Sequence, residues 1–484
     1  MINILVSLIS FLLGLIPLWQ MFIWERSEGT PLTRFTFVYF LIQHIAFGFG
    51  GFLIAIFDQD SSYLSLHGYF PYADGLARLQ LINLISLYAA LAGMWAIIAG
   101  RRFIGASLHG CPSILRRDHH GAMVENHEQL LRRICYVSLV FHAIIVSLQW
   151  YATYTGISDT GISRYLIQIG AKVAPATFFF LGIWWPHGRR GRWIFATYIL
   201  VYGLMQLASG GRAPILYGVF MFFAGLLIVS PRWFMHPRRL VVVAIAAVLI
   251  PWLAVQSEDI RLLYHSRVPQ DLGDWARNMT TLVGPKQIGV EGTGNISPGP
   301  ETLDRTLFRF GARITELAAL DIVARTPEEF PYWGWSETDW LMLGTGWLPA
   351  FLFPDLPKDE DSGVLFLRHY GWAVDPEHGH AMPVTLLADS WRRFGWPGVI
   401  TVHFFWAAFL TTISMLMGRR LSMQVIVLSG ALLYIFTFSY TDDIFILATS
   451  MPRKVVVALA YATLISAICL LMSTRWARVR ADSF

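Results

Sequence analysis

Residues 240–261 read LVVVAIAAVLIPWLAVQSEDIR, and the boundary inside this stretch decides the fold. Residues 240–256 carry no charged side chain, whereas Glu258, Asp259 and Arg261 follow directly. An uninterrupted apolar run of roughly 20 residues is what a helix needs to cross the hydrocarbon layer of a bilayer. The stretch therefore predicts a membrane-spanning helix that ends where a long polar region, residues 257–393, begins.

The rest of the chain repeats this apolar pattern on both sides of the polar region. Of 484 residues, 55% are hydrophobic and only 14% are charged, against about 25% charged in a typical soluble domain. A membrane β-barrel would show short alternating segments, not continuous apolar runs. The sequence predicts an all-α, polytopic membrane protein with about eleven transmembrane helices. The expected spans are residues 2–24, 35–57, 78–99, 134–154, 165–186, 193–209, 213–230, 240–256, 397–417, 422–440 and 455–473.

Arginine distribution predicts the orientation of these helices. Basic residues are dense in one alternate set of loops, for example at Arg101, Arg102, Arg189 and Arg190, and sparse in the other set. Loops rich in Lys and Arg stay on the cytoplasmic side. We therefore expect a multi-pass protein of a bacterial inner membrane, with the polar region forming one large, mainly helical periplasmic loop.

This topology divides the chain into three parts. Residues 1–256 are expected to hold transmembrane helices 1–8, and residues 257–396 the large loop. Residues 397–484 are expected to hold helices 9–11 and a cytoplasmic tail.

Composition also excludes several classes of function. Cys111, Cys135 and Cys469 are the three cysteines, too few for a disulfide framework or a cysteine-based metal site. The net charge of +5 comes mostly from loop arginines that set orientation, so no nucleic-acid partner is expected. A Walker A loop is also missing, which argues against ATP-driven transport by this chain alone. We expect membrane lipids as partners, and neither a metal nor another cofactor.

A short loop between two apolar runs is the first candidate binding site. Gly210, Gly211 and Arg212 precede Pro214, which suits the first turn of a helix. Glycines let the backbone approach a ligand, and free N–H groups at a helix start favour an anion. The alternative is a tight hairpin whose Arg212 reaches the lipid headgroups.

Three further arginines recur at every fourth residue of an expected helix in the large loop, namely Arg305, Arg309 and Arg313. This spacing puts them on one helix face, where guanidinium groups suit bidentate contacts to phosphate. A surface face paired with Asp304 and Glu316 is the simpler alternative. Arg453, in the outer loop before the last span, either closes the same cavity or anchors the chain to headgroups.

Candidate general bases follow in the same loop. His378 and His380 stand beside carboxylates, and a histidine of this kind can take a proton from a sugar hydroxyl. Their spacing matches no recognised zinc pattern, and a polar loop explains them equally well. Asp389 is the other candidate base, or the residue that orients an arginine.

These segments, in this order, resemble the Wzy-type polymerases of bacterial oligosaccharide repeat units and, more distantly, the O-antigen ligases. The similarity covers about residues 190–460. The matching pieces are SGGR at 209–212, RFGARITE at 309–316, GWLP at 346–349 with FP at 353–354, and TLLAD at 385–389 with FGWPG at 394–398. The chain departs from many polymerases in that its first outer arginine loop is only a few residues long.

The resemblance implies a membrane glycosyltransferase that polymerises repeat units carried on undecaprenyl diphosphate at the periplasmic face, for O-antigen, capsule or exopolysaccharide. Arg212, Arg309 and Arg313 would hold the diphosphate, and His380 or Asp389 would activate the acceptor hydroxyl. The similarity to the ligases, which are expected to carry a histidine in the corresponding outer loop, favours His378 or His380 for that role. A chain-length regulator protein is a possible partner. A ligase, a flippase or exporter of lipid-linked sugar, and a scaffold without enzymatic activity stay open as alternatives.

Overall fold

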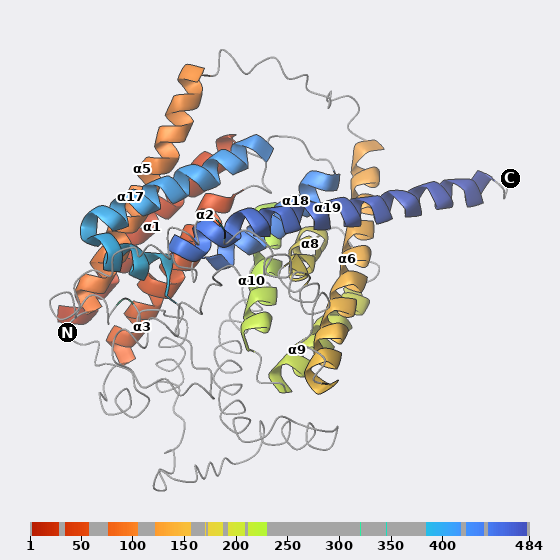
Figure 1. The fold of residues 1–484 in the computed structure, drawn as a ribbon, viewed down its shortest axis with the longest axis horizontal. Helices are drawn as coiled ribbons and strands as arrows, with labels where there is room; N and C mark the ends of the chain where they lie inside the picture. The colour runs from red at the N-terminus through yellow and green to blue at the C-terminus, as the bar shows by residue number, and fades with distance from the viewer. Residues whose placement is uncertain are drawn as a thin grey trace, which may run out of the picture. The chain divides into compact units, whose positions relative to one another are not determined.

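The structure, a computed structural model, describes residues 2–28, 34–57, 76–104, 122–155, 170, 173–186, 192–208, 212–229, 320, 345, 384–417, 423–439 and 444–481. These residues are almost entirely helical and include no β-strand (Figure 1). Within them, six helical stretches are long and apolar enough to cross a membrane. They are Ile4–Trp24, Phe35–Ile56, Leu76–Gly100, Gln129–Gln149, Leu386–Met417 and Leu447–Met472. The prediction of an all-α chain is confirmed for the described residues, and these residues include six helices suited to crossing a membrane; the count of about eleven spans and the large periplasmic loop stay predictions.

The chain folds as two compact units, each with its own core. Unit 1 consists of Met1–His119 and Gly311–Leu464, and unit 2 of His120–Phe310 and Ile465–Phe484. The described helices of unit 1 are α1 (Ile2–Glu28), α2 (Phe35–His44), the π-helix η1 (Ile45–Phe49), α3 (Gly50–Phe57), α5 (Leu76–Ile104), α17 (Leu386–Met417) and α18 (Met423–Phe438). Those of unit 2 are α6 (Ala122–Thr155), α8 (Ala176–Trp184), α9 (Arg192–Ala208) and α10 (Arg212–Val229). Helix α19 (Ile444–Ala481) contributes to both units. Because these units are defined by packing, the division expected from membrane crossings stays a prediction.

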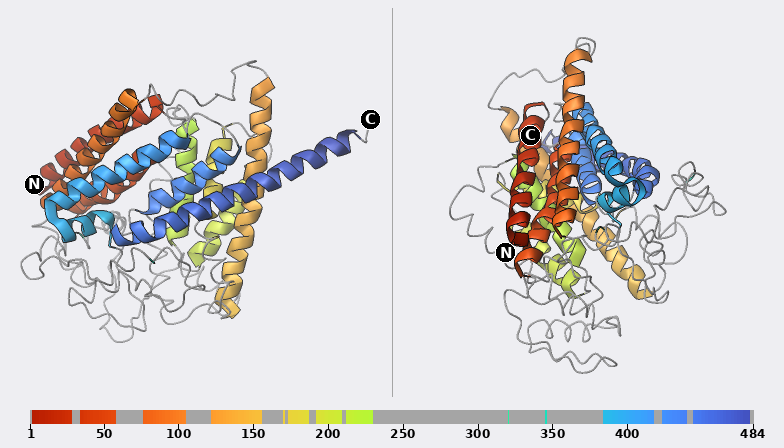
Figure 2. Two further views of the ribbon diagram at one scale, coloured as in Figure 1. Left: turned by 45° about the horizontal axis from the view of Figure 1, so that its top comes forward. Right: turned by 90° about the vertical axis from the view of Figure 1, so that its left-hand side faces the viewer.

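Helices α5 and α17 form the closest helix pair of unit 1 and run in the same direction (Figures 1 and 2). The guanidinium of Arg78 lies over the ring of Trp391, 5.3 Å from its centroid, near the start of both helices. Further along both helices, Gly93 lies directly against the backbone of Phe404, where a Cβ atom would overlap the carbonyl oxygen. The absence of a side chain at Gly93 therefore sets how closely the two helices approach.

Helix α1 runs parallel to α5, and α2 runs against α1 and α17. The hydroxyl of Tyr88 donates to the carbonyl of Leu13 over 3.4 Å, and the rings of Trp24 and Trp95 lie 4.3 Å apart. On α2, the Thr36 and Thr411 hydroxyls share a hydrogen bond of 2.9 Å at its start. Helices α1, α5 and α17 thus point one way, and α2 points the other way.

A buried polar network joins α1, α2 and α5. His44 donates through Nε2 to the carbonyl of Phe11 over 3.0 Å, so its Nδ1 accepts from the Asn83 amide over 3.3 Å. Gln43 donates to Asn83 Oδ1 over 3.3 Å and to the Ser86 hydroxyl over 2.7 Å, and Ser86 donates to the Asn83 carbonyl over 2.7 Å. The tautomer of His44 with its proton on Nε2 satisfies both hydrogen bonds of the ring in this network.

The ring of His44 occupies a slot that two glycines leave open. It stacks on Phe11 with centroids 5.2 Å apart and planes 5° from parallel. A Cβ atom at Gly14 or at Gly48 would overlap this ring. Gly48 belongs to the π-helix that directly follows His44. The absence of side chains at Gly14 and Gly48 therefore makes room for the imidazole beside α1.

The segment expected to span the membrane at 422–440 contains α18, an apolar helix of 16 residues that is shorter than the six candidate spans. Phe436 near its end contacts Phe35 at the start of α2, with ring centroids 5.3 Å apart. Trp406 and Phe409 of α17 complete this aromatic cluster. The end of α18 is therefore packed beside the start of α2.

Unit 2 is built around α8, in which every residue is buried. The Thr177 hydroxyl donates to the Ser138 carbonyl of α6 over 2.9 Å. His142 of α6 donates to or accepts from the Tyr198 hydroxyl of α9 over 2.5 Å, and its ring lies edge-on to Tyr202. Together with contacts of Trp184 and Phe178 to α9, these pairs make α6 and α9 parallel and α8 antiparallel to both.

Gly93→Ala tests the close contact between α5 and α17. The added methyl group would meet the Phe404 carbonyl, so we expect a loss of stability of about 1–3 kcal/mol. Thermal unfolding of the purified protein in detergent measures this change. Gly100→Ala is the matched control, because nothing lies within 4 Å of a Cβ at this position of the same helix. Equal melting of the two variants would contradict the assigned packing.

Candidate functional site

The start of α17 is a buried helical segment with its own cap. The Thr385 hydroxyl accepts from the backbone N–H of Ala388 over 3.1 Å, and the Thr385 carbonyl accepts from the N–H of Asp389 over 2.9 Å. A threonine in this place satisfies N–H groups that the first helical turn leaves unpaired. Thr385 and Ala388 have no exposed surface. The segment therefore begins inside the protein, and its polar residues are held there.

A break at Gly395 separates this segment from the rest of α17. Gly395 has φ 59° and ψ −142°, a conformation that residues with a side chain rarely adopt. Pro397 then opens the second segment, where its missing N–H is no loss. A Cβ at Gly398 would overlap the Ser390 carbonyl, so the two segments touch through glycine. Figure 2 shows the short first segment set at an angle to the long second one.

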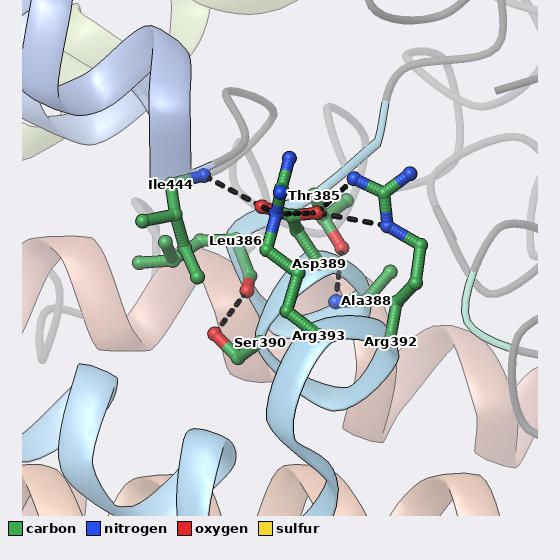
Figure 3. Close-up of polar contacts among 8 residues, drawn as sticks. All are labelled: Thr385, Leu386, Ala388, Asp389, Ser390, Arg392, Arg393 and Ile444. Carbon is green, nitrogen blue, oxygen red and sulfur yellow. Dashed lines mark hydrogen bonds and ion pairs between the residues drawn. The ribbon is translucent and has the colours of Figure 1, made fainter. Parts of the chain in front are cut away.

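Asp389 lies at the centre of a buried ion-pair cluster on the first segment (Figure 3). Its carboxylate has no exposed surface. Arg392 donates from Nε to Oδ1 over 2.9 Å and also from Nη2. Arg393 donates from Nε to both carboxylate oxygens, each over 3.0 Å. The side chains of Arg392 and Arg393 are 4% and 6% exposed, so all three charges are held away from water.

The same carboxylate also caps a second helix. The backbone N–H of Ile444, the first residue of α19, donates to Oδ2 of Asp389 over 3.1 Å (Figure 3). A helix start presents unpaired N–H groups and a partial positive charge, and a carboxylate satisfies both. Asp389 therefore ties the start of α19 to the start of α17, 55 residues earlier in the chain.

This geometry favours an orienting role for Asp389, one of the two roles open from the sequence. Both carboxylate oxygens already accept bonds from guanidinium or backbone N–H groups. A general base needs an oxygen that can reach the proton of a substrate hydroxyl. A carboxylate that fixes two guanidinium groups instead preorganises them, and oriented guanidinium groups suit the oxygens of phosphate. In this cluster, Asp389 therefore orients the guanidinium groups of Arg392 and Arg393.

The other sequence candidates lie partly outside the described residues. Helix α10 begins at Arg212, at the expected end of the short loop. Arg453 lies on α19 directly after Pro452 and is partly buried, nine residues beyond Ile444. The remaining candidates fall outside the described ranges, and their roles stay predictions: Gly210, Gly211, Arg305, Arg309, Arg313, His378 and His380.

Arg392 and Arg393 are the site residues that the sequence interpretation missed. Their spacing from Asp389, three and four residues, is the spacing at which side chains on a helix meet. That signal was present beside a residue already singled out. Over the part of the chain that the structure describes, no group of three or more His, Cys, Asp or Glu side chains gathers where it could hold a metal ion.

Asp389→Asn tests the charge balance of the cluster. Removing the carboxylate charge leaves two buried guanidinium groups without their shared partner, so we expect a loss of stability of about 3–5 kcal/mol. The double variant Asp389→Asn/Arg393→Gln should lose less stability than the two single variants together, because both changes remove the same interaction. Thermal unfolding of the four proteins of this cycle gives the coupling. Additive losses would show that the ion pair carries no energy.

Gly395→Ala tests the backbone break. An alanine cannot adopt this conformation without strain, so we expect a loss of about 1–3 kcal/mol. Gly203→Ala, in α9, is the control, since nothing lies within 4 Å of a Cβ there. Circular dichroism during heating compares the two variants. A Gly395→Ala protein as stable as Gly203→Ala would argue against the left-handed conformation at residue 395.

No family model, curated protein or solved structure matches this chain. The arrangement of Asp389, Arg392 and Arg393 therefore has to be interpreted from its own chemistry.

Proposed function

We propose that this chain is a membrane glycosyltransferase that polymerises oligosaccharide repeat units carried on undecaprenyl diphosphate. The observation that carries the proposal is the pair Arg392 and Arg393, oriented by the buried carboxylate of Asp389. It lies in the segment whose sequence, TLLAD followed by FGWPG, contributes to the resemblance to Wzy-type polymerases. A diphosphate leaving group is the chemistry that such a pair suits best.

The chemical role of the arginines would be to bind and to stabilise charge. When the growing chain leaves its lipid carrier, the bond from the anomeric carbon to a phosphate oxygen breaks, and negative charge grows on the diphosphate. Preorganised guanidinium groups stabilise that charge without having to reorient during the reaction. Arg212, Arg305, Arg309, Arg313 and Arg453, with Gly210 and Gly211, remain proposed contributors to this site.

The acceptor hydroxyl needs a base, and His378 or His380 is the preferred candidate. The carboxylate oxygens of Asp389 are engaged by Arg392, Arg393 and Ile444. A neutral histidine offers an accepting nitrogen near physiological pH. Asp389 would then be a positioning residue whose effect on the reaction passes through the arginines.

Helix directions in unit 1 support the proposed topology of about eleven spans with a large periplasmic loop. Helices α5 and α17 run in parallel, so the chain between them must cross the membrane an odd number of times. The five apolar runs proposed between residues 104 and 386 meet this condition. The position of α18 departs from this pattern. If the spans strictly alternated in direction, the end of α18 would lie on the side of the membrane opposite to the start of α2. Phe436 near the end of α18 instead contacts Phe35 at the start of α2.

Extension of a lipid-linked repeat unit by the purified protein tests the function. The substrate is the undecaprenyl-diphosphate-linked unit extracted from cells that lack this protein, supplied in liposomes. We expect a ladder of products of increasing length, and a fall in kcat/KM of about 100-fold for Arg392→Ala or Arg393→Ala. Arg132→Ala is a control at an exposed arginine of unit 2 that lies over Tyr136.

The products distinguish the alternatives. Transfer of preformed polymer to lipid A core, without a ladder, would instead make the protein a ligase. Movement of the unit across the liposome membrane without a new glycosidic bond would make it a flippase. A folded wild-type protein that extends nothing would overturn the proposal.

A further inference from the structure

Among the described residues, the carboxylate of Asp389 has one partner that is not a side chain. Arg392 and Arg393 donate to it through long side chains, whereas Ile444 donates through its backbone N–H over 3.1 Å (Figure 3). An arginine side chain has several rotatable bonds and loses much rotamer freedom when it is held in place. The N–H of Ile444 instead belongs to the backbone of α19, a helix of 38 residues. It is therefore the most rigid of the three partners.

The hydrogen bonds divide the two oxygens of Asp389 between these partners. Oδ1 accepts from Nε of Arg392 over 2.9 Å and from Nε of Arg393 over 3.0 Å. Oδ2 accepts from the N–H of Ile444 and from Nε of Arg393. The two oxygens belong to one planar group, so rotating it would break the bond to Ile444. While that bond is intact, Oδ1 stays directed toward Arg392.

Burial and charge both strengthen the contact between Asp389 and Ile444. The first turn of α19 contains no acidic residue, and a helix start carries a partial positive charge. Asp389 supplies the negative charge from another helix, and it has no exposed surface. A hydrogen bond to an ionised group is strong, and more so where the local dielectric constant is low.

The first segment of α17 determines the backbone positions of Arg392 and Arg393 but not the directions of their side chains. Thr385 caps this segment, and the break at Gly395 ends it. The guanidinium groups lie several rotatable bonds away from that backbone. Their common contact is the carboxylate of Asp389, and the direction of this carboxylate depends on the start of α19.

We propose that Ile444 is a positioning residue of the candidate site and that it acts through its backbone N–H. The N–H orients the carboxylate of Asp389, and the carboxylate holds Arg392 and Arg393 in the arrangement that receives the diphosphate of the lipid-linked substrate. The start of α19 thereby becomes part of the arginine site. This inference rests on the proposed function for the identity of the ligand.

Substitutions at residue 444 separate the N–H from the side chain. Ile444→Ala keeps the N–H and removes most of the side chain. Ile444→Pro also removes the N–H, and proline suits the first residue of a helix. Isoleucine α-hydroxy acid at the same position replaces the N–H by an ester oxygen and keeps the side chain. Met423→Pro, at the first residue of α18, is the control for proline at a helix start.

Binding of undecaprenyl diphosphate in phosphatidylcholine nanodiscs tests the positioning role without requiring catalysis. We expect the proline and ester variants of residue 444 to bind about tenfold more weakly than Ile444→Ala, because the arginines must then be ordered during binding. Met423→Pro should leave binding unchanged. The titrations are made at a temperature well below the melting temperature of every variant, so that unfolding does not contribute.

Reaction of the arginines with phenylglyoxal, followed by mass spectrometry, measures the arrangement directly and needs no lipid. A guanidinium held by Asp389 has to leave the carboxylate before it reacts, so weaker holding speeds the reaction. We expect Arg392 and Arg393 to react about tenfold faster in the proline and ester variants than in Ile444→Ala. The exposed Arg132 of unit 2 should react at the same rate in all variants.

Equal affinities and equal modification rates for Ile444→Pro and Ile444→Ala would overturn the inference. This holds even if Ile444→Pro melts at a lower temperature, since the N–H would then serve only to cap α19. In the extension reaction, kcat/KM should fall further for Ile444→Pro than for Ile444→Ala. A wild-type protein that extends nothing, with modification rates that differ as expected, would reject the polymerase and keep the positioning role of Ile444.

Discussion

Asp389 carries a negative charge with no exposed surface, and unit 1 depends on how that charge is balanced. A lone buried carboxylate is costly, and the cost is offset here by two guanidinium groups and the first N–H of α19. Asp389 and these three partners come from two stretches of chain that are far apart in sequence. Balancing one charge thus fixes the position of two helix starts and the direction of two arginine side chains.

Glycine has a complementary part in this architecture. In a membrane, helices gain little from the hydrophobic effect against one another, so close packing has to supply the stability. Gly93 brings α5 against α17, and Gly398 brings the two segments of α17 together. Gly395 supplies the backbone conformation that turns the chain between them. Small residues therefore determine where the larger charged residues can stand.

Much of the helical architecture could be predicted from the sequence, because a long apolar run is a local property. The spans beginning near residues 2, 35, 78 and 455 correspond to described helices. Asp389 was also recognisable, and its spacing to Arg392 and Arg393 follows from helix geometry. In the same way, the glycines at 395 and 398 mark a break in a periodic pattern.

Contacts between distant segments were not accessible in this way. Ile444 reaches Asp389 across 55 residues, and no periodicity in either segment indicates the other. The stacking of Arg78 on Trp391 is of the same kind. The π-helix after His44 was equally hidden, since a run of apolar residues and glycine fits an ordinary α-helix.

The network around His44 has a consequence for the depth of α5. Sliding this helix by one turn, about 5.4 Å, would break every bond from Asn83 and Ser86 to α2 at once. Lipid hydrocarbon offers no replacement partners, so intermediate positions are strongly disfavoured. Arg78 stands only five residues before Asn83, about 8 Å along the axis. The buried hydrogen bonds of Asn83 and His44 thus set how far the exposed guanidinium of Arg78 projects beyond the hydrocarbon.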